Sequence, residues 1–247
     1  MARIPSKPLY MKKADLYDRI LSDFPYVEKT FDKILLALKD YIGSKGEVEI
    51  LEFGFGTGLL TEKIAKLEKV SYLTGIDPSG DFYSCARKRL KRYKKVRLIK
   101  KDAISYKHPH PVDIIVTSFT YHHIPDAKKL TFLKSAVENL KAEGILILGD
   151  EFISSFRNKK EKIKSIKKFY SLFMFYLKTH GARKETLDAF QNSLKGSLQG
   201  VEEFKTSLKI FKKQLTLTGL KIIEMIPIYP RRKSEEMGCK VIILLKT

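Results

Sequence analysis

The sequence of 247 residues predicts an α/β fold, and three observations lead to that prediction. Apolar runs of strand length alternate along the chain with longer segments in which apolar residues recur at helical spacing. A glycine-rich turn joins the first apolar run, residues 48–51, directly to such a helical segment, which is typical of strands connected through helices. Two last apolar runs, residues 220–228 and 239–245, are separated by a polar stretch with proline and glycine, and they predict a terminal hairpin.

The glycine-rich turn is the most informative motif of the chain. The apolar run before it ends in an acid, Glu52, and three glycines follow at alternate positions, Gly54, Gly56 and Gly58. Glycine permits backbone angles that other residues avoid and lets a ligand lie against the main chain, while the next helix offers free N–H groups. Asp77 follows a second apolar run, nineteen residues after Gly58, where an acid suits the hydroxyls of a ribose. The pattern therefore predicts a nucleotide-like ligand at this turn.

The spacing of the glycines excludes two common nucleotide motifs. A dinucleotide fingerprint requires glycine at relative positions one, three and six, but position six is Leu59 counted from Gly54 and Thr61 counted from Gly56. A phosphate loop ending in Gly-Lys-Ser/Thr is also absent. The remaining pattern, acid-x-Gly-x-Gly-x-Gly, resembles the class I S-adenosylmethionine-dependent methyltransferases. The resemblance implies that S-adenosyl-L-methionine is the cofactor, with its methionine end held by the acid and glycines and its ribose by Asp77.

Later segments follow the same family pattern in order and spacing. Residues 96–103 resemble the third strand, ending at Asp102 beside Ala103, where the family contacts adenine. Residues 112–125 resemble the fourth strand, which includes Ser118, and its active-site loop. The fold that the resemblance implies is a Rossmann-like, seven-stranded, mostly parallel sheet with an antiparallel C-terminal strand, plus a helical cap. The cofactor-binding residues that it implies are Glu52, Gly54, Gly56, Gly58, Asp77, Asp102, Ala103 and Ser118.

Each of these residues also has a structural explanation that the sequence leaves open. The glycines can serve strand-to-helix packing alone, and Glu52 can be a solvated charge at a strand end. Asp77 stands before a Pro-Ser-Gly turn, so it can cap that turn or the following helix, and Asp102 can do the same. Only the fold around these residues decides between the two roles.

Helical segments are expected on either side of the core. Residues 9–42 show helical spacing interrupted by Pro25, which predicts two helices. Their tyrosines are candidates to face the site, although core packing explains each one as well: Tyr10, Tyr17 and Tyr26.

A second helical region is expected between the fifth strand and the terminal hairpin. Residues 152–205 are too long for a loop and are apolar at helical spacing, so we expect an insertion that covers the carboxyl ends of the strands and selects the substrate. Helix is also expected over residues 201–217. The expected units are an N-terminal helical segment at 1–45, a cofactor-binding core at 46–151 and 206–247, and a helical cap at 152–205.

Candidate catalytic groups follow the fourth and fifth strands. His122 and His123 come just after the fourth strand, where either is a candidate general base because histidine titrates near neutrality. Glu151, with Asp150 before it, ends the fifth strand and competes as base or substrate anchor. The alternative for the histidine pair is simple packing of the loop. Methyl transfer from a sulfonium is an in-line displacement, so a base is needed only where the nucleophile starts protonated.

The composition limits the size of the domain, the cellular location and the metal sites that we expect. A hydrophobic fraction of 43% supports a core for one domain with an appended element. The sequence lacks both a run of eighteen apolar residues and a secretory stretch at its start, so we expect a cytoplasmic protein without a membrane span. Cys85 and Cys239 are too far apart in the sequence for a metal-binding motif. His108 and His110 lie in a His-Pro-His-Pro segment that contains no acidic residue or cysteine as a further ligand. We therefore expect no metal.

The charge of the chain is strongly positive. Lysine and arginine number 48 against 28 acidic residues, a net charge of +20. Ten of the fifteen residues in 87–101 are basic and none is acidic. Such a segment indicates an RNA partner or an anionic small substrate, but a solvated helix face in a generally basic proteome explains it as well.

The sequence thus predicts an S-adenosylmethionine-dependent methyltransferase acting on a small or medium-sized substrate, with an anionic one among the options. One alternative is a tRNA or rRNA methyltransferase that uses residues 87–101. The base-amino methylase signature Asn/Asp-Pro-Pro-Tyr/Phe is absent, because Ser-Phe-Thr-Tyr stands at residues 118–121. Another alternative is a non-catalytic scaffold subunit that kept the fold. The sequence leaves the oligomeric state open.

Overall fold

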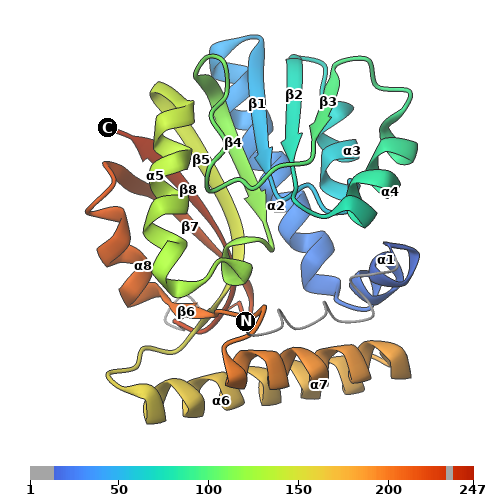
Figure 1. Cartoon of the computed structure of the whole chain (residues 1–247), viewed down its shortest axis with the longest axis vertical. Coiled ribbons are helices and arrows are strands. Elements are labelled where there is room, and N and C mark those ends of the chain that lie inside the picture. Colours follow the sequence, from blue (N-terminus) through green and yellow to red (C-terminus); the bar gives the residue numbers. More distant parts are fainter. Residues whose placement is uncertain (1–13, 232–235) are drawn as a thin grey trace, which may run out of the picture.

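The computed structural model describes residues 14–231 and 236–247, and Tyr10 lies outside the described residues. One sheet carries the fold, with strand order β3-β2-β1-β4-β5-β8-β7, and the two-residue strand β6 pairs with β5 (Figure 1). The strands are β1 (Val48–Phe53), β2 (Val70–Ile76), β3 (Val96–Ile99), β4 (Val112–Ser118), β5 (Leu140–Ile153), β6 (Thr206–Ser207), β7 (Leu220–Tyr229) and β8 (Gly238–Lys246).

Helices connect most of these strands and flank the sheet. Pro25 opens the second helix, where a missing N–H is tolerated, and so the chain forms two N-terminal helices as predicted. The α-helices are α1 (Ala14–Ser22), α2 (Pro25–Lys45), α3 (Leu59–Ala65), α4 (Gly80–Leu90), α5 (Lys129–Asn139), α6 (Lys159–Thr179), α7 (Lys184–Gln199) and α8 (Leu208–Leu215), and the short 3-10 helices are η2 (Tyr121–His123) and η3 (Asp126–Lys128).

The direction of the strands confirms the predicted fold class. β1 pairs in parallel with β2 and β4, β2 with β3, and β4 with β5. β8 pairs antiparallel with both β5 and β7, so the two last strands form the predicted hairpin and β8 is the antiparallel strand. The sheet is therefore mostly parallel, and helices connect its successive parallel strands except β3 and β4, which a loop joins (Figure 1).

The core lies in two layers, one on each face of the sheet. Along β8, Cys239, Val241 and Ile243 pack into one cluster, and Ile242 and Leu244 pack into the other. This alternation is the period of two that a strand buried on both faces requires. α2 and α3 cover the first face, while α5 and α8 cover the second. Burial of each large side chain stabilises the sheet by about 1.5–3 kcal/mol.

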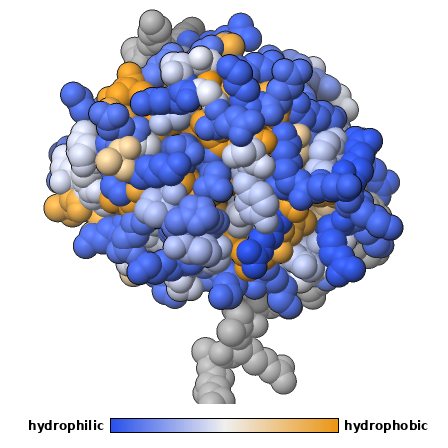
Figure 2. Space-filling model, turned by 90° about the horizontal axis from the view of Figure 1, so that it is seen from above, coloured by the Kyte–Doolittle hydropathy of each residue, from blue (hydrophilic) through white to orange (hydrophobic). Residues whose placement is uncertain are grey.

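The α6–α7 hairpin lies across the carboxyl ends of the parallel strands, at the bottom of Figure 1. α1 approaches the same end, and Arg183 at the start of α7 pairs with Asp23, just after α1, at 2.7 Å. In open α/β sheets this end of the strands holds the ligands. The opposite end, at the top of Figure 1, is seen in Figure 2; hydrophilic residues cover most of that face.

Two local expectations are corrected. β3 ends at Ile99, where the chain turns through a hydrogen bond from the Lys101 N–H to the Ile99 carbonyl, so Asp102 belongs to the following loop. Residues 201–205 are not helical, because Gly200 ends α7 in the left-handed conformation and the Phe204 N–H donates to the His122 carbonyl (2.6 Å). Within the described residues, no helix is both long enough and apolar enough to cross a membrane.

Candidate active site

The turn between β1 and α3 places backbone at the edge of the sheet. Gly54, Gly56 and Gly58 all lie in the left-handed region, with φ values of 79°, 53° and 84°. A Cβ at Gly54 would lie 2.0 Å from Oγ1 of Thr120, so that position requires glycine for a close approach as well. Gly56 faces open space, and its N–H donates to Oδ2 of Asp77 (2.9 Å). The turn therefore leaves room for a ligand against its main chain.

Asp77 follows β2 and joins two backbone segments. Its Oδ2 accepts the Gly56 N–H, and its Oδ1 accepts the Ser79 N–H at 2.8 Å. Ser79 in turn caps α4 by accepting the Phe82 N–H. These bonds hold the carboxylate in one orientation beside the glycine turn.

Glu52 is buried at the end of β1, with 1% of its surface exposed. Burial raises the pKa of this carboxyl to about 8, and the nearby Asp77 charge adds to the effect. Among the residues that the structure describes, neither Oε2 of Glu52 nor Oγ of Ser118 has a hydrogen-bond partner. Buried polar atoms of this kind call for a water or a ligand.

A cavity of about 390 Å³, here called the large cavity, opens beside these groups at the carboxyl ends of β1, β2 and β4. Glu52 lines a recess of about 40 Å³ that shares Gly54, Gly56 and Ser118 with it. Gly58 lies away from the cavity, where a Cβ would press on Ala86 of α4. The predicted cofactor residues that line the large cavity are Gly54, Gly56, Asp77, Asp102, Ala103 and Ser118.

A second, smaller cavity of about 90 Å³, here called the small pocket, adjoins the large cavity. Tyr17 of α1, Phe119 and His123 line both. The remaining walls of the small pocket combine aromatic and ionisable side chains, among them Phe24, Tyr26, His122, Glu151, Phe190, Glu203 and Lys205. The three predicted catalytic residues therefore meet at one pocket.

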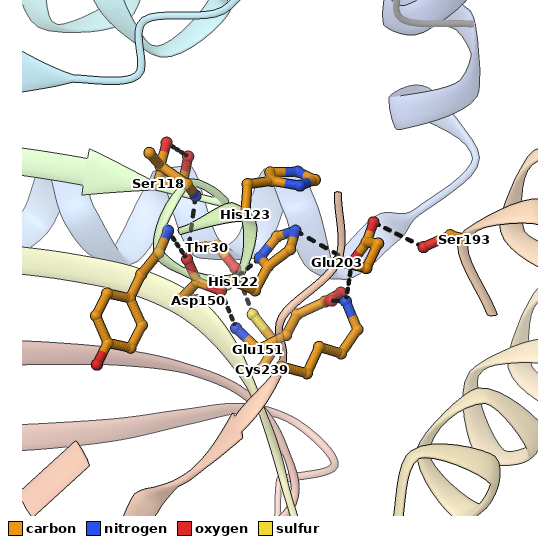
Figure 3. Close-up of polar contacts among 12 residues, drawn as sticks. Thr30, Ser118, His122, His123, Asp150, Glu151, Ser193, Glu203 and Cys239 are labelled. Carbon is orange, nitrogen blue, oxygen red and sulfur yellow. Dashed lines mark hydrogen bonds and ion pairs between the residues drawn. The ribbon is translucent and has the colours of Figure 1, made fainter. Parts of the chain in front are cut away.

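His122 is buried and held by Asp150 (Figure 3). Its Nδ1 lies 2.6 Å from Oδ1 of Asp150, whose Oδ2 accepts the backbone N–H groups of Thr120 and Tyr121. Burial opposes a charged imidazole, but the Asp150 carboxylate outweighs it and raises the pKa of His122. Burial likewise opposes the Asp150 charge, yet His122 and the backbone donors lower the pKa of Asp150. This arrangement fixes the His122 tautomer and orientation.

His123 differs from its neighbour in its charge state. Burial, followed by the adjacent His122, lowers the pKa of His123 to about 4, so the ring is neutral at pH 7. Its Nδ1 lies 2.7 Å from the Glu202 carbonyl. A carbonyl only accepts, so Nδ1 carries the proton and Nε2 is an acceptor.

The buried ammonium of Lys205 joins the two carboxylates of the small pocket. Nζ of Lys205 lies 2.7 Å from Oε2 of Glu151 and 2.9 Å from Oε2 of Glu203. Tyr26 donates to Oε1 of Glu151 at 2.8 Å, and Ser193 donates to Oε1 of Glu203 at 2.7 Å. Charged groups this deeply buried are stable only when paired in this way.

Comparison with known proteins agrees with this geometry. Residues 50–144 match the model of a methyltransferase-domain family, Methyltransf_25. An uncharacterized methyltransferase of Oceanobacillus iheyensis is 30% identical over 155 residues, 62% of each chain. Over these regions the chain is similar to S-adenosylmethionine-dependent methyltransferases. It therefore spans just under two thirds of the length of that curated relative.

Solved methyltransferases share the fold over nearly the whole chain. A methyltransferase from Clostridium acetobutylicum has a TM-score of 0.63 at 15% identity, covering 94% of this chain and 96% of its own. The N-methyltransferase NodS of Bradyrhizobium japonicum, in complex with S-adenosylhomocysteine, has a TM-score of 0.53 at 17% identity, covering 90% of this chain and 88% of its own.

The large cavity fits the cofactor of this methyltransferase family. Its size lies within the roughly 300–1,000 Å³ of small-molecule sites. Oε2 of Glu52 and Oγ of Ser118 supply polar atoms without partners among the described residues, and Gly56 faces empty space. Asp77 and Asp102 both line the cavity; Asp102 is exposed, and its Oδ1 accepts the Ile104 N–H at 2.8 Å.

Sequence reasoning missed Glu203 and Lys205, because they lie in a segment expected to be helical, where charged residues usually face solvent. Instead, this segment runs beside the 3-10 helix η2 and carries both side chains into the small pocket. No local signal distinguishes Lys205 from the many exposed lysines of this chain. Gly200 was the one available indication, since it marks the end of the preceding helix.

Proposed function

We propose that this protein transfers the methyl group of S-adenosyl-L-methionine to a small or medium-sized molecule whose methyl-accepting group lies in the small pocket. The observation that carries the proposal is the wall shared by the two cavities, formed by Tyr17, Phe119 and His123. A substrate in the small pocket is then placed next to a methyl group in the large cavity. Such juxtaposition is the main requirement of an in-line transfer.

The residues predicted for the cofactor receive distinct roles in this proposal. Glu52, with the backbone of Gly54 and Gly56, lies where the methionine end binds, and Gly58 starts α3 behind them. Asp77 faces the ribose hydroxyls, while Asp102, Ala103 and Ser118 surround the remaining part of the cofactor. The bound cofactor supplies an electrophilic methyl group on a sulfonium, and the protein orients and dehydrates the reactants.

We assign the catalytic roles to His122, His123 and Glu151. His122, oriented by Asp150, is the base that receives a proton from the substrate, since its raised pKa makes it the better acceptor of the two histidines. His123 is a neutral acceptor at the boundary of the two cavities. Glu151, held by Tyr26 and Lys205, anchors the substrate.

The three parts of the chain expected from the sequence, the N-terminal helical segment, the core and the helical cap, have separate roles in this proposal. We assign substrate selection to α1 and to the helical cap at 152–205, because both contribute walls of the small pocket. The core at 46–151 and 206–247 holds the cofactor. The same geometry favours a small acceptor over RNA, because none of the basic residues in 87–101 lines either cavity.

The proposal is tested by calorimetric titration with S-adenosylhomocysteine, the product form of the cofactor. We expect binding, and we expect Asp77→Asn to raise the Kd at least tenfold, because asparagine has one acceptor oxygen where Asp77 uses two, so either the Gly56 or the Ser79 N–H loses its acceptor. Asp81→Asn is the matched control, since Asp81 is an exposed acid on α4 outside the large cavity. A protein that does not bind the product at all is a scaffold, and the proposal is then wrong.

A further inference from the structure

We propose that the methyl acceptor is an amine, whose basic nitrogen lies among His122, His123 and Glu203 in the small pocket. The inference rests on the proposed function and specifies its substrate class. It differs from the anionic substrate that the positive net charge of the chain had indicated, because the residues that line the small pocket carry an excess of negative charge.

The walls of the small pocket carry an excess of negative charge. Glu151 and Glu203 contribute two carboxylates, and Lys205 contributes one ammonium that bonds both of them. The ammonium also lies over the rings of Phe169 and Tyr170, at 5.2 and 5.4 Å from their centroids. Lys205 is thus fully occupied within the protein, and one negative charge is left for a ligand to balance.

The other charged groups near the pocket do not change this balance. Any positive charge on His122 is matched by Asp150 behind it, while His123 is neutral. Nζ of Lys129 donates to the Tyr121 carbonyl at 2.6 Å, and Lys129 does not line the small pocket. A cationic group therefore suits this pocket better than an anionic one.

Three acceptor atoms surround the position proposed for the nitrogen. One ring nitrogen from each histidine and one carboxylate oxygen of Glu203 lie within 4.8 Å of one another. Nε2 of His122 and Oε2 of Glu203 are 3.9 Å apart, too far for a hydrogen bond but close enough for one donor to bridge them. An atom equidistant from the three corners of such a triangle lies no more than about 2.8 Å from each of them, within reach of a charge-assisted N–H bond.

The same spacing argues against a metal ion in this place. Zinc binds histidine nitrogen and carboxylate oxygen at about 2.0–2.2 Å, so two of its tetrahedral ligand atoms lie about 3.4 Å apart, closer than the 3.9 Å between Nε2 of His122 and Oε2 of Glu203. A metal would also lie beside the Lys205 ammonium, which already occupies Oε2 of Glu203. An ammonium with three N–H donors satisfies the three acceptors without moving them.

Aromatic side chains complete the recognition of a cation. Tyr17, Phe24, Tyr26, Phe119 and Phe190 all line the small pocket. Aromatic faces attract ammonium groups more strongly where water is excluded. These walls favour an amine attached to an apolar or aromatic body.

The chemistry balances with groups already present. The bound ammonium gives one proton to Nε2 of His122, and the amine nitrogen then turns so that the lone pair left on it faces the methyl group. That lone pair forms the new N–C bond while the C–S bond of the cofactor breaks and its electrons return to sulfur. The products are a methylated ammonium, a neutral thioether and a protonated His122, which afterwards releases its proton to solvent. The positive charge of the sulfonium thus ends on the product nitrogen.

The test is a titration of the protein saturated with S-adenosylhomocysteine, which lacks the sulfonium charge. Benzylamine is the probe, with benzyl alcohol and benzoate as neutral and anionic controls of the same ring. We expect benzylamine to bind at least tenfold more tightly than either control. We also expect Glu203→Gln to reduce the affinity for benzylamine at least tenfold, while Glu161→Gln, the same change at a half-buried acid in the first turn of α6 that lines neither cavity, has no effect.

The outcomes separate this inference from the proposed function. If the protein binds the three probes equally, or binds none of them, the amine assignment is wrong. The proposed function still stands in that case, provided that S-adenosylhomocysteine binds. Failure of S-adenosylhomocysteine to bind overturns both. If Zn²⁺ or Mn²⁺ stabilises the protein against unfolding, and this effect is lost in His123→Ala, then His122, His123 and Glu203 form a metal site. The amine assignment is wrong in that case. The comparison of probes on the unchanged protein decides the question even if Glu203→Gln does not fold.

Discussion

Glu52 shows how far the surroundings of one residue change its chemistry. Its carboxyl is buried beside Asp77 at the end of β1, and burial raises its pKa to about 8. The sequence identified this acid by its place before the glycines, but its protonation depends on the fold around it. In the folded protein without ligand, Glu52 is therefore largely protonated at pH 7.

The raised pKa of Glu52 makes stability depend on pH. Between about pH 4.5 and pH 8 the folded protein holds a proton at Glu52 that the unfolded chain has lost, so the free energy of unfolding falls as pH rises. One such group accounts for a slope of at most about 1.4 kcal/mol per pH unit. We expect Glu52→Gln to reduce this slope, as measured by urea denaturation at pH 6, 7 and 8. An unchanged slope in the variant would show that Glu52 is ionised in the folded protein.

At the scale of elements, α1 is attached to the glycine turn by a small set of polar contacts. Oδ2 of Asp18 pairs with Arg89 of α4 at 2.5 Å, and its Oδ1 accepts the Thr57 hydroxyl at 2.5 Å. Arg89 also donates to the Thr57 carbonyl. These contacts hold Tyr17 against the boundary between the two cavities. α1 is thus coupled to the turn that the cofactor is proposed to touch.

Removal of Arg89 should loosen this attachment. We expect Arg89→Ala to raise the Kd for S-adenosylhomocysteine roughly 3- to 10-fold, corresponding to about 1 kcal/mol for a partly exposed, hydrogen-bonded ion pair. Hydrogen exchange of residues 14–22 should accelerate at the same time. Arg92→Ala is the matched control, because Arg92 bonds Glu62 and Tyr93 instead of α1. Equal effects of the two variants would attribute the change to lost positive charge alone.

At the scale of the whole molecule, the two cavities lie where several elements meet, and a ligand there should stabilise the complete fold. The large cavity is lined by residues from α1, α4 and the loops after β1, β2, β3 and β4. Most of these loops are close together only when the sheet is assembled. Binding is therefore linked to global folding.

This linkage predicts a shift in thermal unfolding. S-adenosylhomocysteine at 100 times its Kd should stabilise the protein by about 2.7 kcal/mol, which raises the Tm by roughly 5–10 °C for a chain of this size. Homocysteine alone should have no such effect. Differential scanning calorimetry measures the shift, and Asp77→Asn should reduce it at equal ligand concentration. A shift of the same size in that variant would contradict the place assigned to Asp77.

The sequence by itself determined the order of strands and helices, the glycine turn after β1 and the terminal hairpin, because these follow from local patterns of apolar residues and backbone preference. It also placed His122, His123 and Glu151 at strand ends on one edge of the sheet, where parallel strands bring their carboxyl ends together. Whether Asp77 and Asp102 cap turns or hold a ligand was open in the sequence, and the structure shows turn contacts for both at the rim of the large cavity.

Only the tertiary structure decided which charges are buried. Lys205 looks like any of the surface lysines in the sequence, yet its environment is set by Glu151, 54 positions earlier, and by the end of α7. A buried charge depends on partners brought from distant parts of the chain, since desolvation is offset only by contacts that the folded state creates. That is why the meeting of His122, His123 and Glu151 was predictable from strand ends, whereas the balance of charge inside the small pocket was not.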